Sequence, residues 1–309
     1  MLKDSRIYVA GHTGLAGSAI MRKLSSENYG NVICRTRAEL DLTNQLAVEQ
    51  FFAAFRPEYV FLSAARVGGI LANSTRPAEF IRENLLIQTH VIDAAYRHGC
   101  GKLLFLGSSC AYPRDAPQPV QEEHFMTGPL EATNTAYAIA KIAGIQMAQA
   151  YRQQYGFDAI SLMPTNLYGP GDRYDLQSSH VLAALMGKFH AAKVSGAREV
   201  VLWGSGQPMR EFLHADDLAD AAVFLMQHYS SAEIVNVGTG KDISVMDLAL
   251  LIREVVGSKA QIVHDLSKPD GTPRKLLDIS RLTALGWKAS VGLRAGIERT
   301  YRAFLKDRT

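Results

Sequence analysis

The fold is decided by one stretch near the N-terminus, Arg6-Ile7-Tyr8-Val9-Ala10-Gly11-His12-Thr13-Gly14-Leu15-Ala16-Gly17. Its first part is rich in β-forming residues and predicts a short strand, and Ser18 to Leu24 continue as a good helix. Glycines at every third position join the two elements. A turn of this kind lets the backbone approach a ligand closely, and the helix N-terminus offers free N–H groups to a pyrophosphate. We therefore predict a dinucleotide-binding turn from Gly11 to Gly17.

Strands and helices alternate beyond this turn. The pattern predicts a strand at 32–34, a helix at 41–55, a strand at 59–62, a helix at 77–98, a strand at 103–106, a helix at 135–155 and a strand at 159–163. Asp41-Leu42-Thr43 is the predicted N-terminal cap of the helix that ends at Phe55. Alternation of this kind is typical of an α/β protein with a doubly wound, parallel Rossmann sheet.

The pattern becomes less regular after residue 170. We expect a nucleotide-binding domain over 1–170 and a smaller, mixed α/β substrate domain over 171–309, with a helix at 181–192 and a strand at 200–203. The chain is expected to return to the main sheet at about 212–240. The elements of that return are Phe212-Leu213-His214, a helix from Asp216, and Ile234-Val235-Asn236-Val237.

Composition narrows the class of protein. The 309 residues are 47% hydrophobic and 20% charged, which is typical of a globular chain. The net charge of +3 comes without a block of lysines or arginines, so we expect neither nucleic acid nor a membrane as partner. The cysteines, Cys34, Cys100 and Cys110, are scattered and odd in number, which argues against disulfides. Without a secretory segment, this predicts a cytoplasmic protein.

A chemically active group follows the strand at 103–106. The strand ends in Gly107-Ser108-Ser109-Cys110, and ligands of open α/β sheets lie at the carboxyl ends of strands. Cys110 would point the same way as Ser108 if the backbone stayed extended. Tyr137 and Lys141, four residues apart, share one face of the next predicted helix. A neighbouring cation lowers the pKa of a phenol and makes it usable in acid–base catalysis.

Two arginines follow the predicted second strand. An NAD-selective site would favour an acidic residue here, whereas Arg35 and Arg37 suit the 2′-phosphate of NADP(H). We therefore expect NADPH rather than NADH as cofactor. A solvated pair of surface arginines is the alternative.

The order of glycine turn, serine-ended strand and Tyr-xxx-Lys resembles the extended short-chain dehydrogenase/reductase superfamily. Within it, the chain is similar over its full length to the GDP-L-fucose synthase family. The shared motifs include Gly11 to Ala19, Arg35-Thr36-Arg37, Val67-Gly68-Gly69-Ile70, Leu106 to Cys110, Pro164 to Pro170, Trp203-Gly204-Ser205-Gly206, Met209-Arg210-Glu211-Phe212-Leu213-His214 and Lys268 to Lys275. Thr13 departs from this family, whose bacterial members often carry arginine there. That departure leaves Arg37 as the main candidate for the 2′-phosphate.

The resemblance implies an NADP-dependent epimerase and reductase that acts on a GDP-4-keto-6-deoxy sugar, without a metal. It implies catalytic roles for Ser108, Tyr137, Lys141, Cys110 and His180, with Cys110 and His180 as the acid–base pair of epimerisation. Further cofactor contacts would come from Leu106, Gly107, Lys141, Pro164, Thr165, Asn166, Leu167 and His180. Substrate contacts would come from Lys188, Trp203, Arg210 and Asp270. In the manner of the superfamily, helices 78–98 and 135–155 could pair in a homodimer.

Alternative functions remain open at this point. A 4,6-dehydratase or 4-epimerase could use the same fold, but a dehydratase would place an Asp-Glu pair beside the serine, where Ser109 and Cys110 stand. A GDP-L-colitose synthase would use the same triad on a 3-deoxy sugar. A dinucleotide sensor without turnover should have lost part of the triad. For single residues, Cys110 could be an inert core thiol, His180 a helix-start polar residue, and Lys188 and Arg210 solvated surface charges.

Overall fold

The structure is a computed structural model that describes residues 1–174, 180–268 and 270–307. Its main sheet is parallel and has the order β2-β1-β3-β4-β5-β9. The strands are β1 (Ile7–Ala10), β2 (Val32–Ile33), β3 (Tyr59–Leu62), β4 (Lys102–Leu106), β5 (Asp158–Pro164) and β9 (Val235–Val237). The doubly wound α/β fold is thereby confirmed. The order reverses beside β1, so a ligand is expected at the carboxyl ends of β1 and β3.

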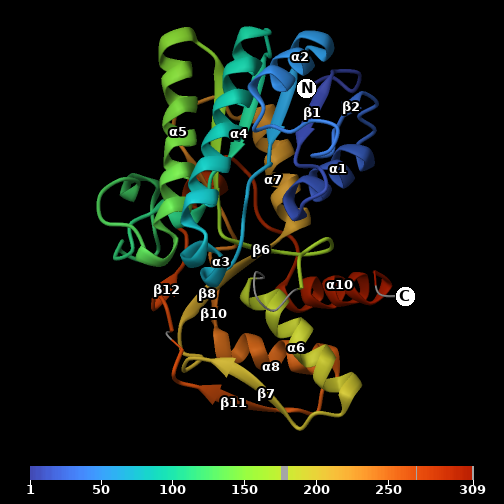
Figure 1. Cartoon of the computed structure of the whole chain (residues 1–309), viewed down its shortest axis with the longest axis vertical. Helices are drawn as coiled ribbons and strands as arrows, with labels where there is room; N and C mark the ends of the chain where they lie inside the picture. The colour runs from blue at the N-terminus through green and yellow to red at the C-terminus, as the bar shows by residue number, and fades with distance from the viewer. Residues whose placement is uncertain (175–179, 269, 308–309) are drawn as a thin grey trace.

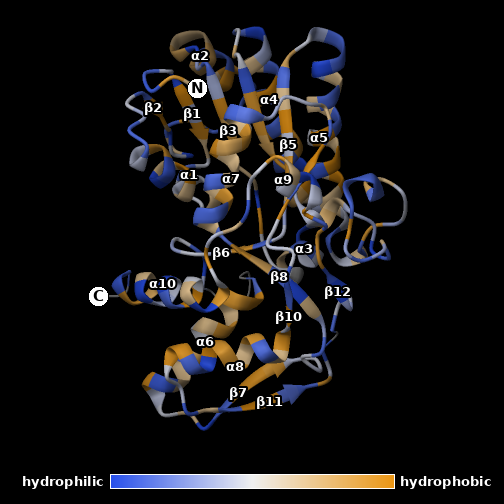
Figure 2. Cartoon of the chain, turned by 180° about the vertical axis from the view of Figure 1, so that it is seen from behind, coloured by the Kyte–Doolittle hydropathy of each residue, from blue (hydrophilic) through white to orange (hydrophobic). Residues whose placement is uncertain are grey.

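Helices cover both faces of this sheet (Figure 1). One face carries α2 (Gln45–Phe55), α4 (Pro77–Arg97) and α5 (Thr135–Tyr155), and the other carries α1 (Leu15–Ser26) and α7 (Ala215–His228). The central strands are continuous apolar runs because both of their faces are buried. Figure 2 shows these strands as hydrophobic ribbons between helices of mixed hydropathy.

A smaller part of the molecule lies below the carboxyl edge of the main sheet (Figure 1). Its central strand β8 (Met209–His214) pairs with β6 (Asn166–Tyr168), β10 (Asp242–Ser244) and β12 (Arg274–Lys275). A separate pair joins β7 (Glu199–Trp203) to β11 (Gln261–Asp265). The helices α6 (Val181–Ser195), α8 (Val245–Val256) and α10 (Leu293–Lys306) share a third core with these strands. Short helices are α3 (Ile70–Thr75), α9 (Ser280–Ala284), η1 (Ser109–Ala111), η2 (Glu122–His124) and η3 (Ala132–Asn134).

The return of the chain to the main sheet differs in one element from the expectation. Helix α7 packs on α1 and β9 pairs with β5, as predicted. Phe212 to His214 belong to β8 and pair with β6 rather than with a strand of the main sheet, although Leu213 packs in the core between that sheet and α7. Their apolar sequence predicts a buried strand, but burial alone does not show which of the two sheets a strand joins.

The start of α2 also differs from the prediction. The helix begins at Gln45, and the Asn44 side chain accepts a hydrogen bond from the amide of Ala47 at 3.1 Å. Asp41 instead closes a local turn, in which its carboxylate accepts from the amide and hydroxyl of Thr43. Both residue types suit a helix cap, and the sequence offered two of them three residues apart.

No helix in the described part of the chain is long and apolar enough to cross a membrane.

Candidate active site

The glycine turn joins β1 to α1 by close backbone packing. Gly11 has a left-handed φ of 84°, and a Cβ there would lie 2.7 Å from Ala64. A Cβ on Gly17 would lie 2.1 Å from the carbonyl oxygen of Gly11. Side chains are therefore excluded at both positions by main-chain atoms that cannot move aside.

This turn fits a dinucleotide. Helix α1 begins after Gly14 without a side-chain cap and without an acidic residue in its first turn. Around Gly14 itself, a Cβ would meet only the Gly11 carbonyl, at an ordinary 3.5 Å. The buried Nδ1 of His12 has no hydrogen-bond partner among the described residues. Free amides, space beside them and an unsatisfied ring nitrogen are the features that a bound pyrophosphate would use.

The two arginines after β2 have different environments. The Arg35 guanidinium lies 4.7 Å from the centre of the Phe55 ring and donates to the carbonyl of Cys34. Arg37 is exposed and reaches Glu83 of α4 at 3.4 Å, and Glu83 also binds Arg66 at 2.7 Å. Arg35 is therefore held by packing, whereas Arg37, which is exposed and held only by a surface ion pair, can turn toward a phosphate.

The catalytic triad of the sequence prediction is brought together by β4 and α5. Gly144 lets the helix approach the strand closely, since a Cβ there would lie 2.4 Å from the Phe105 ring. Lys141 is buried, its Nζ donates to the carbonyl of Leu106 at 2.6 Å, and it lies 5.9 Å from the centre of the Tyr137 ring. Tyr137 is near enough to Ser108 for the hydroxyl to lower the pKa of the phenol by hydrogen bonding.

Cys110 reaches the site by a route that the sequence did not predict. After Ser108 the backbone turns into η1, and Ser108 Oγ accepts from the amide of Cys110 at 3.2 Å. The condition of an extended backbone, under which Cys110 would point the same way as Ser108, is therefore not met. Cys110 nevertheless lies near Tyr137: burial is the main cause of the raised pKa of the phenol, and a thiolate at Cys110 would raise it further.

Burial dominates the titration of the triad. It raises the pKa of Tyr137, opposite to the direction expected from a neighbouring Lys141, and it lowers the pKa of Lys141 to about 7. Both shifts have one physical cause, because a desolvated group favours its neutral form. A neutral phenol is a proton donor, so Tyr137 is set up as an acid.

Residues from distant segments form a second group below the sheet edge. Trp203 at the end of β7 is half exposed, and its ring centre lies 5.2 Å from Lys188 Nζ and 5.7 Å from Lys268 Nζ. Lys188 of α6 also donates to the carbonyl of Val201, and burial lowers its pKa. A flat indole flanked by two ammonium groups can pack against a base or a sugar and attract phosphate.

Arg210 of β8 lies between this group and the triad. Burial lowers its pKa, while the charges of Asp270 and Cys110 raise it, so both groups are near the guanidinium. The Asp270 carboxylate accepts from the amide of Ser205 at 2.6 Å and from its hydroxyl at 2.8 Å. Asp270 therefore holds the turn after Trp203, and its predicted contact with the substrate stays a prediction.

The remaining predicted residues fall at the edges of the site. His180 precedes α6 and is exposed to solvent, while desolvation by the surrounding protein lowers its pKa. Within the described ranges, no hydrogen bond or ion pair links it to Cys110. Gly107 packs on β5 through its amide, which donates to Leu162, and Pro164 ends that strand. Thr165 and Asn166 bind the carbonyl of Glu211, and Leu167 follows in β6.

Sequence reasoning missed the roles of two residues inside quoted motifs. Lys268 lies over Trp203, and Glu211 is a fully buried acid whose pKa is raised by burial. A signal for Glu211 was present, since an acidic residue inside an otherwise apolar strand requires partners.

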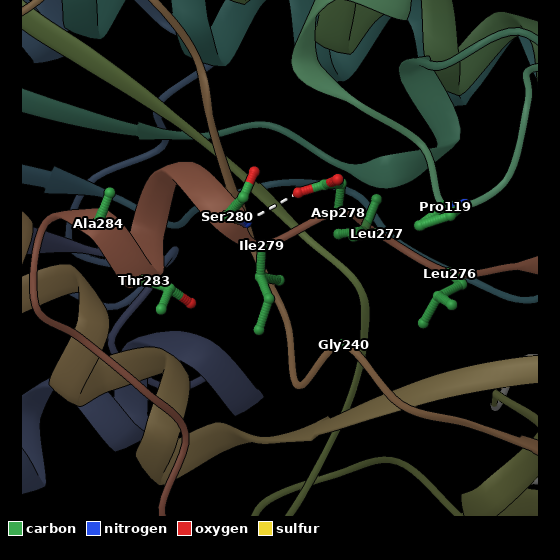
Figure 3. A pocket seen from close by; sticks show the side chains of 9 residues that line it. All are labelled: Pro119, Gly240, Leu276, Leu277, Asp278, Ile279, Ser280, Thr283 and Ala284. Carbon is green, nitrogen blue, oxygen red and sulfur yellow. Dashed lines mark hydrogen bonds between the residues drawn. The ribbon is translucent and has the colours of Figure 1, made fainter.

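A hollow near the turn after β9 is seen from close by in Figure 3. It is lined by Pro119, Gly240, Leu276, Leu277, Asp278, Ile279, Ser280, Thr283 and Ala284, which include none of the predicted site residues. A smaller hollow reaches Ser109 and Thr165 beside the candidate site. Among the described residues, no cluster of His, Cys, Asp or Glu is placed to hold a metal ion.

A glycine turn on a parallel sheet, with Ser108, Tyr137 and Lys141 at its carboxyl edge, defines an NAD(P)-dependent oxidoreductase of the short-chain type. Residues 7–238 match the NAD dependent epimerase/dehydratase family, and the chain belongs to that family.

Individual relatives narrow the comparison to enzymes of GDP-sugars. GDP-L-fucose synthase 1 of Arabidopsis thaliana is 58% identical over 305 residues, which cover 99% of this chain and 94% of the relative. GDP-L-colitose synthase of Yersinia pseudotuberculosis is 34% identical and covers 98% of this chain and 99% of its own. The expected resemblance to GDP-L-fucose synthases is confirmed, and the colitose enzyme is more distant.

The similar solved structures are also enzymes named for GDP-sugars. A GDP-6-OMe-4-keto-L-xylo-heptose reductase from C. jejuni is 37% identical with a TM-score of 0.95, over 100% of this chain and 99% of that one. A GDP-L-fucose synthetase from Naegleria fowleri bound to NADP is 28% identical with a TM-score of 0.92, over 100% and 96% of the two chains.

Proposed function

We propose that the chain converts GDP-4-keto-6-deoxy-D-mannose to GDP-L-fucose by epimerisation at C3 and C5 and reduction at C4 with NADPH. The observation that carries the proposal is the meeting of Ser108, Cys110 and Tyr137 at the carboxyl end of β4. The triad supports reduction, and the added thiol supports proton exchange.

The epimerisation uses the acidity that the C4 ketone gives to its neighbouring C–H groups. A base removes the proton from C3 or C5, and the electron pair moves onto the C4 oxygen as an enolate. Hydrogen bonds from Ser108 and Tyr137 stabilise that oxygen. Protonation of the carbon from the opposite face inverts it. Cys110 and His180 are the proposed base and acid, because a thiol and an imidazole both exchange protons near neutral pH.

The reduction follows at the same ketone. NADPH supplies the hydride to C4 when it is bound on the glycine turn. The Tyr137 hydroxyl gives its proton to the C4 oxygen, and its raised pKa keeps that proton in place until then. Lys141, fixed on the carbonyl of Leu106, borders the phenol and is proposed to bind the nicotinamide ribose.

The proposed ligand positions follow the two parts of the molecule. The cofactor would lie on residues 1–170 with the return at α7 and β9, and the nucleotide sugar on the smaller part. Lys188, Trp203, Arg210 and Asp270 would line the nucleotide-sugar side. We also propose a homodimer through α4 and α5; a monomeric mass in sedimentation at micromolar concentration would contradict it.

Product identification tests the proposed reaction. The chain, NADPH and GDP-4-keto-6-deoxymannose should give GDP-L-fucose, identified by NMR of the isolated sugar, with loss of NADPH absorbance. A product with unchanged C3 would favour a C5 epimerase-reductase of the colitose type. No oxidation with either nicotinamide would contradict the enzyme function.

The preference for NADPH is tested by a matched pair of arginines. Arg37→Gln should weaken NADPH binding by about tenfold, the size of one charge-assisted contact, and leave NADH binding unchanged. Arg35→Gln is the control, since Arg35 packs on Phe55. Binding is measured by nicotinamide fluorescence. Equal effects of the two variants would contradict the role of Arg37.

A further inference from the structure

Glu211 lies fully buried in the middle of β8, and the proposed chemistry does not use it. Its Oε1 accepts from the amides of Thr239 at 2.5 Å and Gly240 at 2.7 Å, and its Oε2 accepts from the amide of Leu277 at 2.9 Å. The carboxylate thus joins β8 to the turn after β9 and to the segment after β12.

A glycine and several backbone amides surround the Glu211 carboxylate and accommodate it. A Cβ on Gly238 would lie 2.3 Å from Glu211 Oε1, so only glycine leaves room there. A buried carboxylate without partners costs several kcal/mol, and here backbone N–H groups supply the partners. Because these donors are backbone amides with little freedom to move, they hold the Glu211 carboxylate in a single orientation.

Glu211 is also linked to residues of both proposed ligand sites, to Asn166 on the cofactor side and to Arg210 on the substrate side. The carbonyl of Glu211 accepts from the Asn166 side chain at 2.8 Å. Arg210 is the preceding residue, and successive side chains of a strand point to opposite faces. With Glu211 held inward, Arg210 is directed to the face where the charges of Cys110 and Asp270 influence it.

We propose that Glu211 is a positioning residue that fixes the register and tilt of β8 and thereby aims Arg210 at the diphosphate of the nucleotide sugar. This inference rests on the proposed function, in which Arg210 contacts the substrate. Glu211 itself touches no ligand.

The experiment measures GDP binding by calorimetry for Glu211→Gln in two backgrounds. A glutamine keeps one acceptor oxygen and turns its NH2 group toward an amide donor, so the side-chain hold on β8 is weakened while its strand pairing remains. In the natural chain the substitution should weaken GDP binding by about tenfold, as for one misplaced charge-assisted contact. In an Arg210→Ala background it should change binding by less than about twofold, because the aimed side chain is gone.

Asp217→Asn is the matched control. Asp217 is also buried and accepts from the amides of Ser290 and Val291, but it lies on α7. It should lower the melting temperature comparably and leave GDP binding unchanged. If Glu211→Gln does not fold, Gly238→Ala displaces the same carboxylate and is compared in the same two backgrounds.

Two results would overturn the inference while leaving the proposed function intact. They are equal weakening of GDP binding in both backgrounds, and weakening by Asp217→Asn as large as by Glu211→Gln. Failure of the unaltered chain to bind GDP would overturn the proposed function itself, and this inference with it.

Discussion

The two sides of the candidate site are built in different ways. On the proposed cofactor side, the pyrophosphate would bind one continuous stretch, Gly11 to Gly17, whose backbone packs closely against itself and against Ala64. The proposed substrate side would gather Lys188, Trp203, Arg210 and Asp270 from α6, β7, β8 and a late loop. Its geometry depends on side chains that hold other side chains or turns.

This difference separates a part that resists change from a part that can vary. Backbone amides at a helix N-terminus recognise a pyrophosphate whatever the side chains, provided glycine keeps the approach open. On the substrate side, each contact is an individual side chain and can be replaced singly. The fold can therefore serve different sugars, and the names of the relatives include GDP-L-fucose, GDP-L-colitose and a GDP-heptose.

The largest expected effect lies where the two sides meet. Tyr137→Phe removes the proton donor and should lower the rate of reduction by roughly 10²–10⁴-fold. Calorimetry should show GDP and NADPH binding within a few-fold of the unaltered chain, because the phenol belongs to neither binding side. A comparable loss of affinity for GDP or NADPH would show that Tyr137 belongs to one of the two binding sides.

A pair of glycines tests the cofactor side. Gly17→Ala should abolish NADPH binding and lower the free energy of unfolding by about 2 kcal/mol, because its Cβ meets main chain at 2.1 Å. Gly14→Ala is the control for stability, since its Cβ makes an ordinary contact at 3.5 Å and should leave the melting temperature nearly unchanged. Urea unfolding and nicotinamide fluorescence report the two properties. Equal destabilisation by both variants would contradict the backbone account.

A pair of aspartates tests the substrate side. Asp270→Ala frees the turn at Ser205 and removes a charge beside Arg210, so GDP binding should weaken by about tenfold with NADPH binding unchanged. Asp265→Ala is the control, because Asp265 holds Ser267 by the same kind of hydrogen bonds. Calorimetry with GDP should show no change for it. Loss of NADPH binding in Asp270→Ala would mean that the two sides are not independent.

A dependence of stability on pH tests the burial of the triad, which lies where the two sides meet. Burial lowers the pKa of Lys141 from its ordinary 10.5 to about 7, so between these values the unfolded chain holds one more proton at this group than the folded chain. The free energy of unfolding should therefore rise with pH in this window, by at most about 1.4 kcal/mol per pH unit from this group. Lys141→Met should reduce that slope in urea unfolding between pH 7 and 9. An unchanged slope would contradict the lowered pKa.

The sequence predicted the continuous features and missed those that depend on distant segments. The helix at 135–155 and the glycine turn follow from local patterns, and both agree with the structure. The position of Cys110 depended on whether the backbone stayed extended, which no pattern of side chains reports. The hold of Asp270 on Ser205 joins residues 65 positions apart, beyond the reach of any local pattern.

The titration of the triad was missed for a related reason. Spacing placed Lys141 beside Tyr137 and suggested that the cation would lower the pKa of the phenol. Burial of both groups sets the opposite direction for Tyr137, and burial is a property of the packed helix and strand rather than of the i,i+4 spacing.

The path of the chain between the two parts restricts how such enzymes can be recombined. The polypeptide leaves the main sheet after β5 and returns through α7 and β9 before it leaves again. A chimaera that exchanged everything after residue 170 would import a foreign edge strand and a foreign helix along with the new sugar site. Exchange of specificity therefore needs two grafts, one on each side of α7 and β9, rather than a transplanted tail.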